Sequence, residues 1–291
     1  MIKLLSTDFD GTLVSHDDDP PVVPELFEML LALRAHGVRW AVNTGRTLDH
    51  IVDGLREFGF PLAPDFVLTN EREVFRPDET GRWVDYGDWN HRCALAHDEL
   101  FAVAEPLIAE VWKFVKTETQ GRAIDDASGM GVLASSNAEM DRIVAFCEQV
   151  RVRMPEFHYQ RNTIYLRFCH VDYSKGTALA ELARLLGIAH GEIFAAGDHH
   201  NDIAMLDGRF ARWVACPGNS ADEVKETVRA AGGYIARGTA GAGVVEALRF
   251  FDAEARGRGV EAEGKVLSAQ FPVQEVQVPK LAPRGELKTE H

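Results

Sequence analysis

Two carboxylates stand two positions apart near the start of the chain, where residues 8–12 read Asp-Phe-Asp-Gly-Thr. They follow a short apolar run, which predicts a buried strand that ends in a glycine turn. Because side chains alternate along a strand, Asp8 and Asp10 face the same pocket. That pocket lies at the strand's carboxyl end, where open α/β sheets bind ligands. Two crowded acids repel each other unless a cation or a proton intervenes, so the pattern favours chemistry on phosphate.

Three further polar motifs follow predicted strands or begin predicted helices. Residues 43–46 read Asn-Thr-Gly-Arg and follow the second predicted strand, and Lys175 begins a helix directly after Ser174. Residues 197–202 read Gly-Asp-His-His-Asn-Asp and follow another short apolar run. In a parallel sheet the carboxyl ends of the strands lie at one edge, so we expect the four motifs to meet.

The elements that must position these motifs alternate between strand and helix in the first and last parts of the chain. Glycines and prolines suit the helix ends. We expect strands at 2–7, 38–43, 66–69, 193–196 and 213–215, and helices at 24–36, 47–58, 174–186, 202–206, 221–230 and 244–251. This alternation predicts an α/β fold with a doubly wound, Rossmann-like parallel sheet and helices on both faces.

The middle of the chain interrupts that alternation with an α+β pattern. A hairpin is expected at 73–75 and 83–86, helices at 92–110 and 137–150, and strands at 111–116, 130–134, 159 and 163–168. We therefore predict a core formed by residues 1–80 and 171–255 and an inserted cap domain at 81–170. Residues 256–291 read as a C-terminal tail, in which the alternating stretch 273–278 could add an edge strand.

Taken together, the four motifs resemble the haloacid dehalogenase superfamily of phosphatases. The insertion, Lys175-Gly176 and the Gly-Asp-x-x-Asn-Asp pattern from Gly197 resemble its Cof-type branch, subfamily IIB, which has a large α/β cap. That branch includes sucrose-phosphate and mannosyl-phosphoglycerate phosphatases and, more distantly, phosphomannomutases. The resemblance implies a Mg²⁺-dependent hydrolase that acts through an aspartyl phosphate on a small sugar or polyol phosphate.

The carboxylate pair fits that chemistry. Asp8 would be the nucleophile, because a carboxylate is already ionised at pH 7 and needs no base to attack phosphorus. Asp10 would protonate the leaving alkoxide and later activate water. For this its pKa must rise by ~3 units, and we expect Asp8 and partial burial to raise it.

Charge balance implies Mg²⁺, because Asp8, Asp198 and a phosphate dianion cannot share one pocket unassisted. We assign Asp8, the backbone carbonyl of Asp10 and Asp198 as metal ligands. Asn201 and Asp202 are expected behind them, fixing Asp198 or reaching Lys175, with helix capping as the alternative.

The phosphate would be bound by Thr44, Gly45 and Lys175. Thr44 offers its hydroxyl and its N–H, although a plain helix cap is the alternative. Lys175 at a helix N-terminus opposes the helix dipole, so a purely structural role fits it poorly.

Four further residues are candidates for substrate specificity. Arg46 could touch substrate or pack a helix end, and Gln160, Arg161 and Asn162 of the cap could bind hydroxyls or a second anion, or form a solvated loop. The sequence departs from the family pattern in two places. Residues 70–72 read Asn-Glu-Arg at the cap hinge, and His199 and His200 could line the rim or bind metal.

Composition narrows the class of protein. The net charge of −14 argues against a nucleic-acid surface, and four dispersed cysteines indicate reduced thiols. The sequence shows neither a membrane-spanning run nor a signal peptide, so we expect a cytoplasmic protein whose partner is a small phosphorylated metabolite. The exact substrate and the oligomeric state stay open.

Three other functions remain alternatives. A phosphomannomutase-like sugar phosphomutase could use the same residues with a sugar as acceptor. A phospho-accepting switch would also use Asp, Thr and Lys, but as one compact domain with its aspartate on a middle strand. A catalytically silent binding protein would not need an acid–base aspartate.

Overall fold

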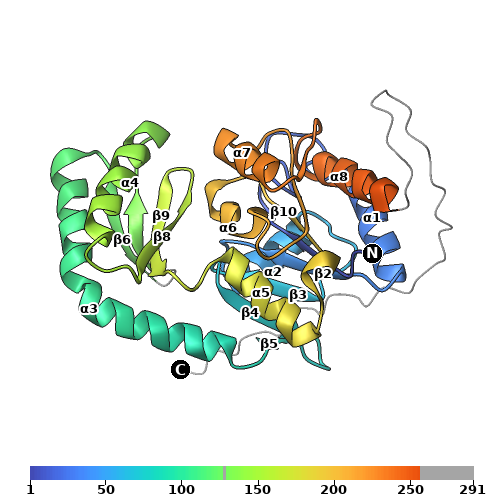
Figure 1. Cartoon of the computed structure of the whole chain (residues 1–291), viewed down its shortest axis with the longest axis horizontal. Helices are drawn as coiled ribbons and strands as arrows, with labels where there is room; N and C mark the ends of the chain where they lie inside the picture. The colour runs from blue at the N-terminus through green and yellow to red at the C-terminus, as the bar shows by residue number, and fades with distance from the viewer. Residues whose placement is uncertain (127–128, 256–291) are drawn as a thin grey trace, which may run out of the picture.

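The computed structural model describes residues 1–126 and 129–255 (Figure 1). Its larger sheet has eight strands in the order β12-β11-β10-β1-β2-β3-β4-β5. The first six strands pair in parallel, and β4 pairs antiparallel with both β3 and β5. In chain order these strands are β1 (Leu4–Thr7), β2 (Arg39–Asn43), β3 (Phe66–Thr69), β4 (Glu73–Pro77), β5 (Trp83–Asp85), β10 (Ile193–Ala196), β11 (Trp213–Cys216) and β12 (Tyr234–Ile235).

Helices cover both faces of this sheet, as expected for a doubly wound fold. Neighbouring residues of β1 point to opposite faces, so Leu5 belongs to one buried cluster and Leu4 to the other. The first cluster contains side chains of α1 (Pro24–Ala35), α2 (Leu48–Glu57) and α8 (Ala240–Ala255). The second contains side chains of α5 (Lys175–Leu186), α6 (Ile203–Leu206) and α7 (Asp222–Ala230). The predicted fold class is confirmed.

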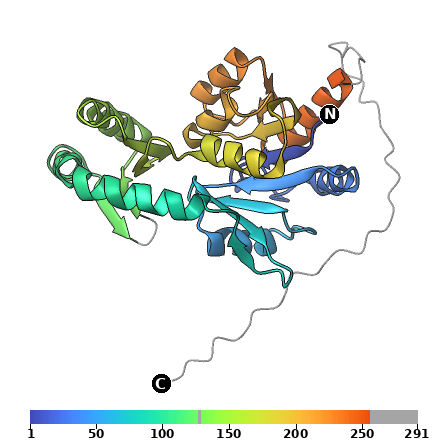
Figure 2. The ribbon, with the colours of Figure 1, turned by 60° about the horizontal axis from the view of Figure 1, so that its bottom comes forward.

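A second, antiparallel sheet has four strands in the order β6-β7-β9-β8. It consists of β6 (Arg122–Asp126), β7 (Gly129–Leu133), β8 (Phe157–Asn162) and β9 (Tyr165–His170). The helices α3 (Trp89–Glu118) and α4 (Asn137–Arg151) pack on one face of it around a third buried cluster. Figures 1 and 2 show this unit, drawn in green, to one side of the larger sheet.

The long helix α3 corrects the sequence prediction. We expected a helix over 92–110 followed by a strand over 111–116, but one helix continues to Glu118. Its buried residues recur every three or four positions, as in Leu100, Ala104, Ile108, Val111 and Val115, and form one apolar stripe. Packing of this stripe against the third cluster overrides the β propensity of the valines.

The hairpin of β4 and β5 is confirmed, and it pairs with the eight-stranded sheet. The larger sheet therefore extends past residue 80, the predicted end of the first core segment. Helix α3 begins against the second cluster with Trp89 and Cys93 and ends in the third. The division into core and cap stays a prediction, and the expected tail 256–291, with its strand 273–278, lies outside the described residues.

Two shorter elements complete the larger unit, the 3₁₀ turns His190–Glu192 and His200–Asp202. The second turn lies directly after β10, where the fourth motif was found. Among residues 1–126 and 129–255, no helix combines the length and apolar character that a bilayer crossing requires.

Candidate active site

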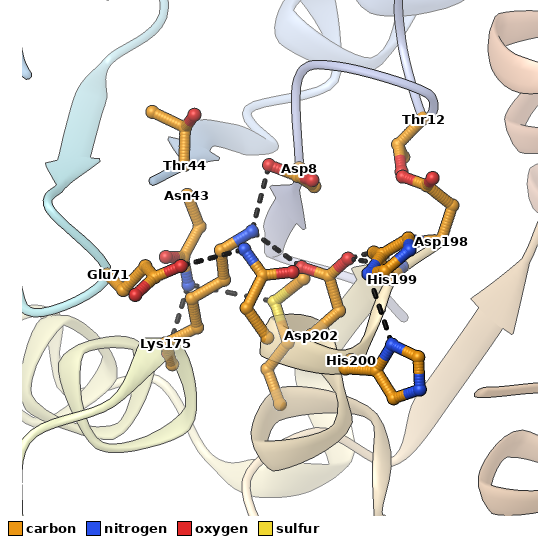
Figure 3. A network of polar contacts seen from close by, with 12 residues as sticks. Asp8, Thr12, Asn43, Thr44, Glu71, Lys175, Asp198, His199, His200 and Asp202 are labelled. Atoms are coloured by element: carbon orange, nitrogen blue, oxygen red, sulfur yellow. Dashed lines mark hydrogen bonds and ion pairs between the residues drawn. The ribbon is translucent and has the colours of Figure 1, made fainter. Parts of the chain in front are cut away.

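A buried lysine joins two of the predicted motifs. Lys175 is the first residue of α5, and its Nζ lies 2.9 Å from Oδ1 of Asp8 and 2.6 Å from Oδ1 of Asp202 (Figure 3). The lysine and Asp202 are fully buried and Asp8 nearly so. Buried charges need partners of opposite sign, so this triad fixes the end of β1 against the start of α5.

The fourth motif folds back on itself around Asp202. Oδ2 of Asp202 accepts hydrogen bonds from the backbone N–H groups of Asp198 and His199, both at 2.9 Å. The hydroxyl of Thr12 donates to Oδ1 of Asp198 at 2.6 Å, so the first motif reaches the fourth directly. Gly11 and Gly197 are required here, because a Cβ on either would collide with the carboxylate of Asp198 or Asp202.

The carboxylates of Asp8, Asp198 and Asp202 offer oxygens that all lie within 4.8 Å of one another. Burial, followed by the charge of Asp202, raises the pKa of Asp198 to about 7. Burial and the charges of Asp202 and Asp198 likewise raise the pKa of Asp8, against the opposing effect of Lys175. Three acids around one ammonium group form a donor set that fits a hard divalent cation. Both oxygens of Asp202 already accept protein donors, which leaves Asp8 and Asp198 as the better ligands.

The expectation of a raised pKa for Asp10 is wrong for this structure. Arg46 donates to both oxygens of Asp10, and His16 lies 2.8 Å from Oδ1. Partial burial favours the neutral acid, but these two partners outweigh burial and lower the pKa of Asp10. The guanidinium of Arg46 also lies over the ring of Phe9, 4.9 Å from its centroid. Arg46 therefore packs near the start of α2 and at the same time pairs with Asp10, the proposed acid.

A cavity of about 160 Å³ lies between the two units of the fold, and Asp8 forms part of its wall. From the larger unit it is lined by Asp8, Asp10, Thr44, Gly45, Arg46 and Glu71, and from the four-stranded sheet by Asn162, Tyr165 and Arg167. Thr44 keeps its hydroxyl at the cavity, where it accepts from the N–H of Arg46. Its own N–H, expected to face phosphate, instead donates to the carbonyl of Leu68 at 2.8 Å.

The amide nitrogen of Asn201 contacts neither Asp198 nor Lys175, which were its expected partners. Its Nδ2 donates to Oε1 of Glu71 at 2.9 Å, and Glu71 is buried with a left-handed backbone (φ 65°). Glu71 was noted in the sequence only as a departure from the family pattern, and its place in the cavity wall was missed. An acid instead of a small residue in that turn was the available signal.

The two histidines lie beside the carboxylates. Nδ1 of His199 accepts from the backbone N–H of Thr163, in the turn between β8 and β9, at 3.2 Å. His200 lies against His199 and against Glu223 of α7. Neither belongs to the group of three acids that could hold a metal, and His199 joins the two units of the fold.

Of the three cap candidates, only Asn162 lines the cavity. Arg161 points to the helix side of the sheet and pairs with Asp141 of α4 at 2.6 Å, and Gln160 is not part of the lining. Tyr165 and Arg167 were missed. They alternate along β9 with the buried Leu166 and Phe168, and this period of two was the signal that places them on the opposite face.

Comparison with protein-family models gives one match: residues 113–248 fit the family of haloacid dehalogenase-like hydrolases. Among relatives, the chain is 25% identical to "Putative phosphatase M6_Spy0533" of Streptococcus pyogenes, over 85% of this chain and 97% of the relative. It is 25% identical to "Putative phosphatase YxeH" of Bacillus subtilis, over 79% and 92%. A phosphoglycolate phosphatase of Natronomonas pharaonis is 27% identical, over 71% and 81%.

Solved structures share the fold at low sequence identity. The sucrose-phosphatase of Synechocystis sp. PCC6803, solved with sucrose and phosphate, superposes with a TM-score of 0.67 at 18% identity, over 87% of this chain and 99% of that one. A sugar phosphatase of subclass IIB superposes with a TM-score of 0.57 at 18% identity, over 86% and 99%.

Proposed function

We propose that this chain, whose residues 113–248 fit the family of haloacid dehalogenase-like hydrolases and whose relatives include putative phosphatases, is a Mg²⁺-dependent phosphatase acting through an aspartyl phosphate on a small sugar or polyol phosphate. The observation that supports this most is the contact of Lys175 with both Asp8 and Asp202, beside Asp198. Three segments far apart in the sequence meet there. Two of them, those of Asp8 and Asp198, follow neighbouring parallel strands at their carboxyl ends.

In this proposal Asp8 attacks phosphorus. Lys175 opposes the rise in the pKa of Asp8 and orients its carboxylate for the attack. When bound at Asp8, Asp198 and the Asp10 carbonyl, Mg²⁺ supplies charge stabilisation to the phosphoryl group. Asp202 holds the backbone of Asp198 in place and shares Lys175. The hydroxyl of Thr44 and the Gly45 backbone bind the phosphate oxygens.

The acid–base step requires a change at Asp10. As long as Arg46 pairs with it, the lowered pKa keeps Asp10 ionised and able only to accept a proton. We propose that the anionic substrate draws Arg46 away, so that the pKa of Asp10 rises and its carboxylate takes up a proton from water. The neutral acid then gives this proton to the leaving oxygen. After the alcohol departs, ionised Asp10 activates water against the aspartyl phosphate.

The proposed substrate class and location follow the same reasoning. The fold matches a sucrose-phosphatase and a subclass IIB sugar phosphatase, and the relatives include phosphoglycolate phosphatases, so the substrate is a small phosphomonoester. We place the reaction in the cytoplasm, where such metabolites occur.

The test is phosphate release by the purified protein with Mg²⁺ from an aryl phosphate and from a panel of sugar and polyol phosphates. Asp8→Asn serves as the inactive control. Absence of turnover by the unmodified protein on every ester contradicts the proposal. Conversion of one sugar phosphate isomer to another faster than phosphate release would instead assign a phosphomutase.

A further inference from the structure

A buried arginine from the four-stranded sheet faces the cavity without a full set of partners. Arg167 of β9 is only 5% exposed, and within the described part of the chain its Nε and Nη1 atoms have no hydrogen-bond partner. Its guanidinium lies 5.6 Å from the ring centroid of Tyr165. Both side chains line the cavity that contains Asp8.

Other arginines of the same unit bind carboxylates. Arg161 pairs with Asp141, and Arg153 pairs with Glu110, both at 2.6 Å. A buried guanidinium is costly unless its charge and its N–H groups are matched by an acceptor. The unmatched nitrogens of Arg167 therefore indicate that an acceptor enters from the cavity.

The cavity acids do not supply that acceptor, because each has another partner. Asp8 binds Lys175, Asp10 binds Arg46, and Glu71 binds Asn201. The scissile phosphoryl group is not the acceptor either, because we place it on the side of the cavity that the larger sheet forms. Asn162 stands opposite Tyr165 in the sheet register, and both residues line the cavity together with Arg167.

We propose that Arg167 binds a second anionic group of the substrate, at the end remote from the phosphomonoester. A guanidinium fork matches the paired oxygens of a carboxylate or a phosphate far better than it matches neutral hydroxyls. This rests on the proposed function and narrows it: the substrate is a phosphorylated sugar acid or hydroxy acid, or a bisphosphate, rather than a neutral sugar phosphate.

The experiment compares kcat/KM within matched substrate pairs that differ in one anionic group. Glycerol 3-phosphate is paired with 3-phosphoglycerate, glucose 6-phosphate with 6-phosphogluconate, and fructose 6-phosphate with fructose 1,6-bisphosphate. The expected result is a preference of about tenfold or more for the more anionic member of at least one pair. A preference in the first two pairs identifies a carboxylate, and one confined to the third identifies a phosphate.

Variants then assign the preference to Arg167. Arg167→Met should reduce kcat/KM of the preferred substrate about tenfold more than that of its less anionic partner, mainly through KM. Arg167→Lys should retain an intermediate preference, because it keeps the charge but not the fork. Arg153→Met removes an exposed arginine from the same unit, and should leave the ratio unchanged.

The outcomes separate this inference from the proposed function. Turnover by the unmodified protein without any preference for the more anionic member overturns the inference alone. An equal loss of kcat/KM on both members of a pair in Arg167→Met also overturns it, provided that a melting curve shows that the variant is folded. Absence of phosphate release from every ester overturns the proposed function itself.

Discussion

Arg46 donates hydrogen bonds to both carboxylate oxygens of Asp10, with Nε 2.7 Å from Oδ2 and Nη2 2.6 Å from Oδ1. The pair lies in the wall of the cavity, and only a quarter of the Arg46 side chain is exposed. A fork of this kind stabilises the ionised carboxylate, and the pKa of Asp10 is lowered accordingly. Arg46 is therefore the main partner that keeps the proposed acid ionised, and His16 is the second.

The first prediction follows from this pairing. Arg46→Met should raise the pKa of Asp10, because removal of a cation favours the neutral acid. Loss of the proton from Asp10 ends acid catalysis, so the alkaline limb of kcat/KM for an alkyl phosphate should move to higher pH by about one unit. The profile of kcat/KM is the right measurement because it reports the free enzyme. An unmoved or downward-shifted limb contradicts the control of Asp10 by Arg46.

The second prediction concerns the leaving group. Asp10→Asn should slow hydrolysis of alkyl phosphates by about 10²-fold or more, because the departing alkoxide needs a proton. Aryl phosphates should lose much less activity, since an aryl oxide departs without one. The measurement is kcat for both ester types with variant and unmodified protein. Equal losses on the two types would remove Asp10 from the acid's role.

The third prediction separates catalysis from stability at Asp8. Asp8→Asn should abolish turnover, because the amide is not a nucleophile. Burial and two neighbouring acids raise the pKa of Asp8, which means that its charge is unfavourable in the fold. We therefore expect metal-free Asp8→Asn to melt at or above the temperature of the unmodified protein at pH 8. A clearly lower melting temperature would show that the contact with Lys175 outweighs the repulsion.

Local sequence patterns predicted most of the larger sheet and its site. Strands at 66–69 and 193–196 and the helix behind Ser174 follow from short apolar runs, a capping residue and Gly187. The alternation of strand and helix then brings Asp8, Lys175 and the acidic turn after β10 together, because parallel strands share one carboxyl edge.

Features that depend on long-range packing could not be predicted in the same way. The helical state of residues 111–116 is decided by contacts of α3 with β7, β9 and α4, and the partner of Asn201 is 130 positions away in Glu71. Arg167 carries no motif, and its importance appears only when β9 is placed opposite Asp8. The pKa of Asp10 was misjudged because the pairing by Arg46 is a tertiary contact.

The fourth prediction concerns Mg²⁺ at Asp198, whose pKa is raised to about 7. A metal ligand must be ionised, so apparent Mg²⁺ affinity should rise about tenfold between pH 6 and pH 8. The measurement is the increase in melting temperature with added Mg²⁺ at each pH, which should be larger at pH 8. Asp198→Asn should lose this increase, and chelation should remove phosphatase activity. A pH-independent shift would contradict the role of Asp198 as a ligand.

The fifth prediction concerns His97, a buried residue of α3 that contacts the last residue of β9. Its Nε2 accepts from the backbone N–H of His170 at 3.1 Å, and its Nδ1 contacts the carbonyl of Cys93 at 2.7 Å. Burial, together with the positive charge of Arg72, lowers the pKa of His97 to about 4. An unfolded chain has an ordinary histidine pKa near 6.5, so it binds the proton more readily than the fold does.

Stability from neutral His97 is therefore complete above about pH 6.5 and is lost as the pH falls toward 4. Over this range the free energy of unfolding should fall by about 2–3 kcal/mol more in the unmodified protein than in His97→Gln. The acids with raised pKa values, such as Asp198, have the opposite dependence, but they are common to both proteins and cancel in the difference. Denaturant unfolding of both proteins at pH 7.5 and pH 4.5 measures this difference in the free energy of unfolding. An equal fall in both proteins would show that His97 is not held neutral by its surroundings.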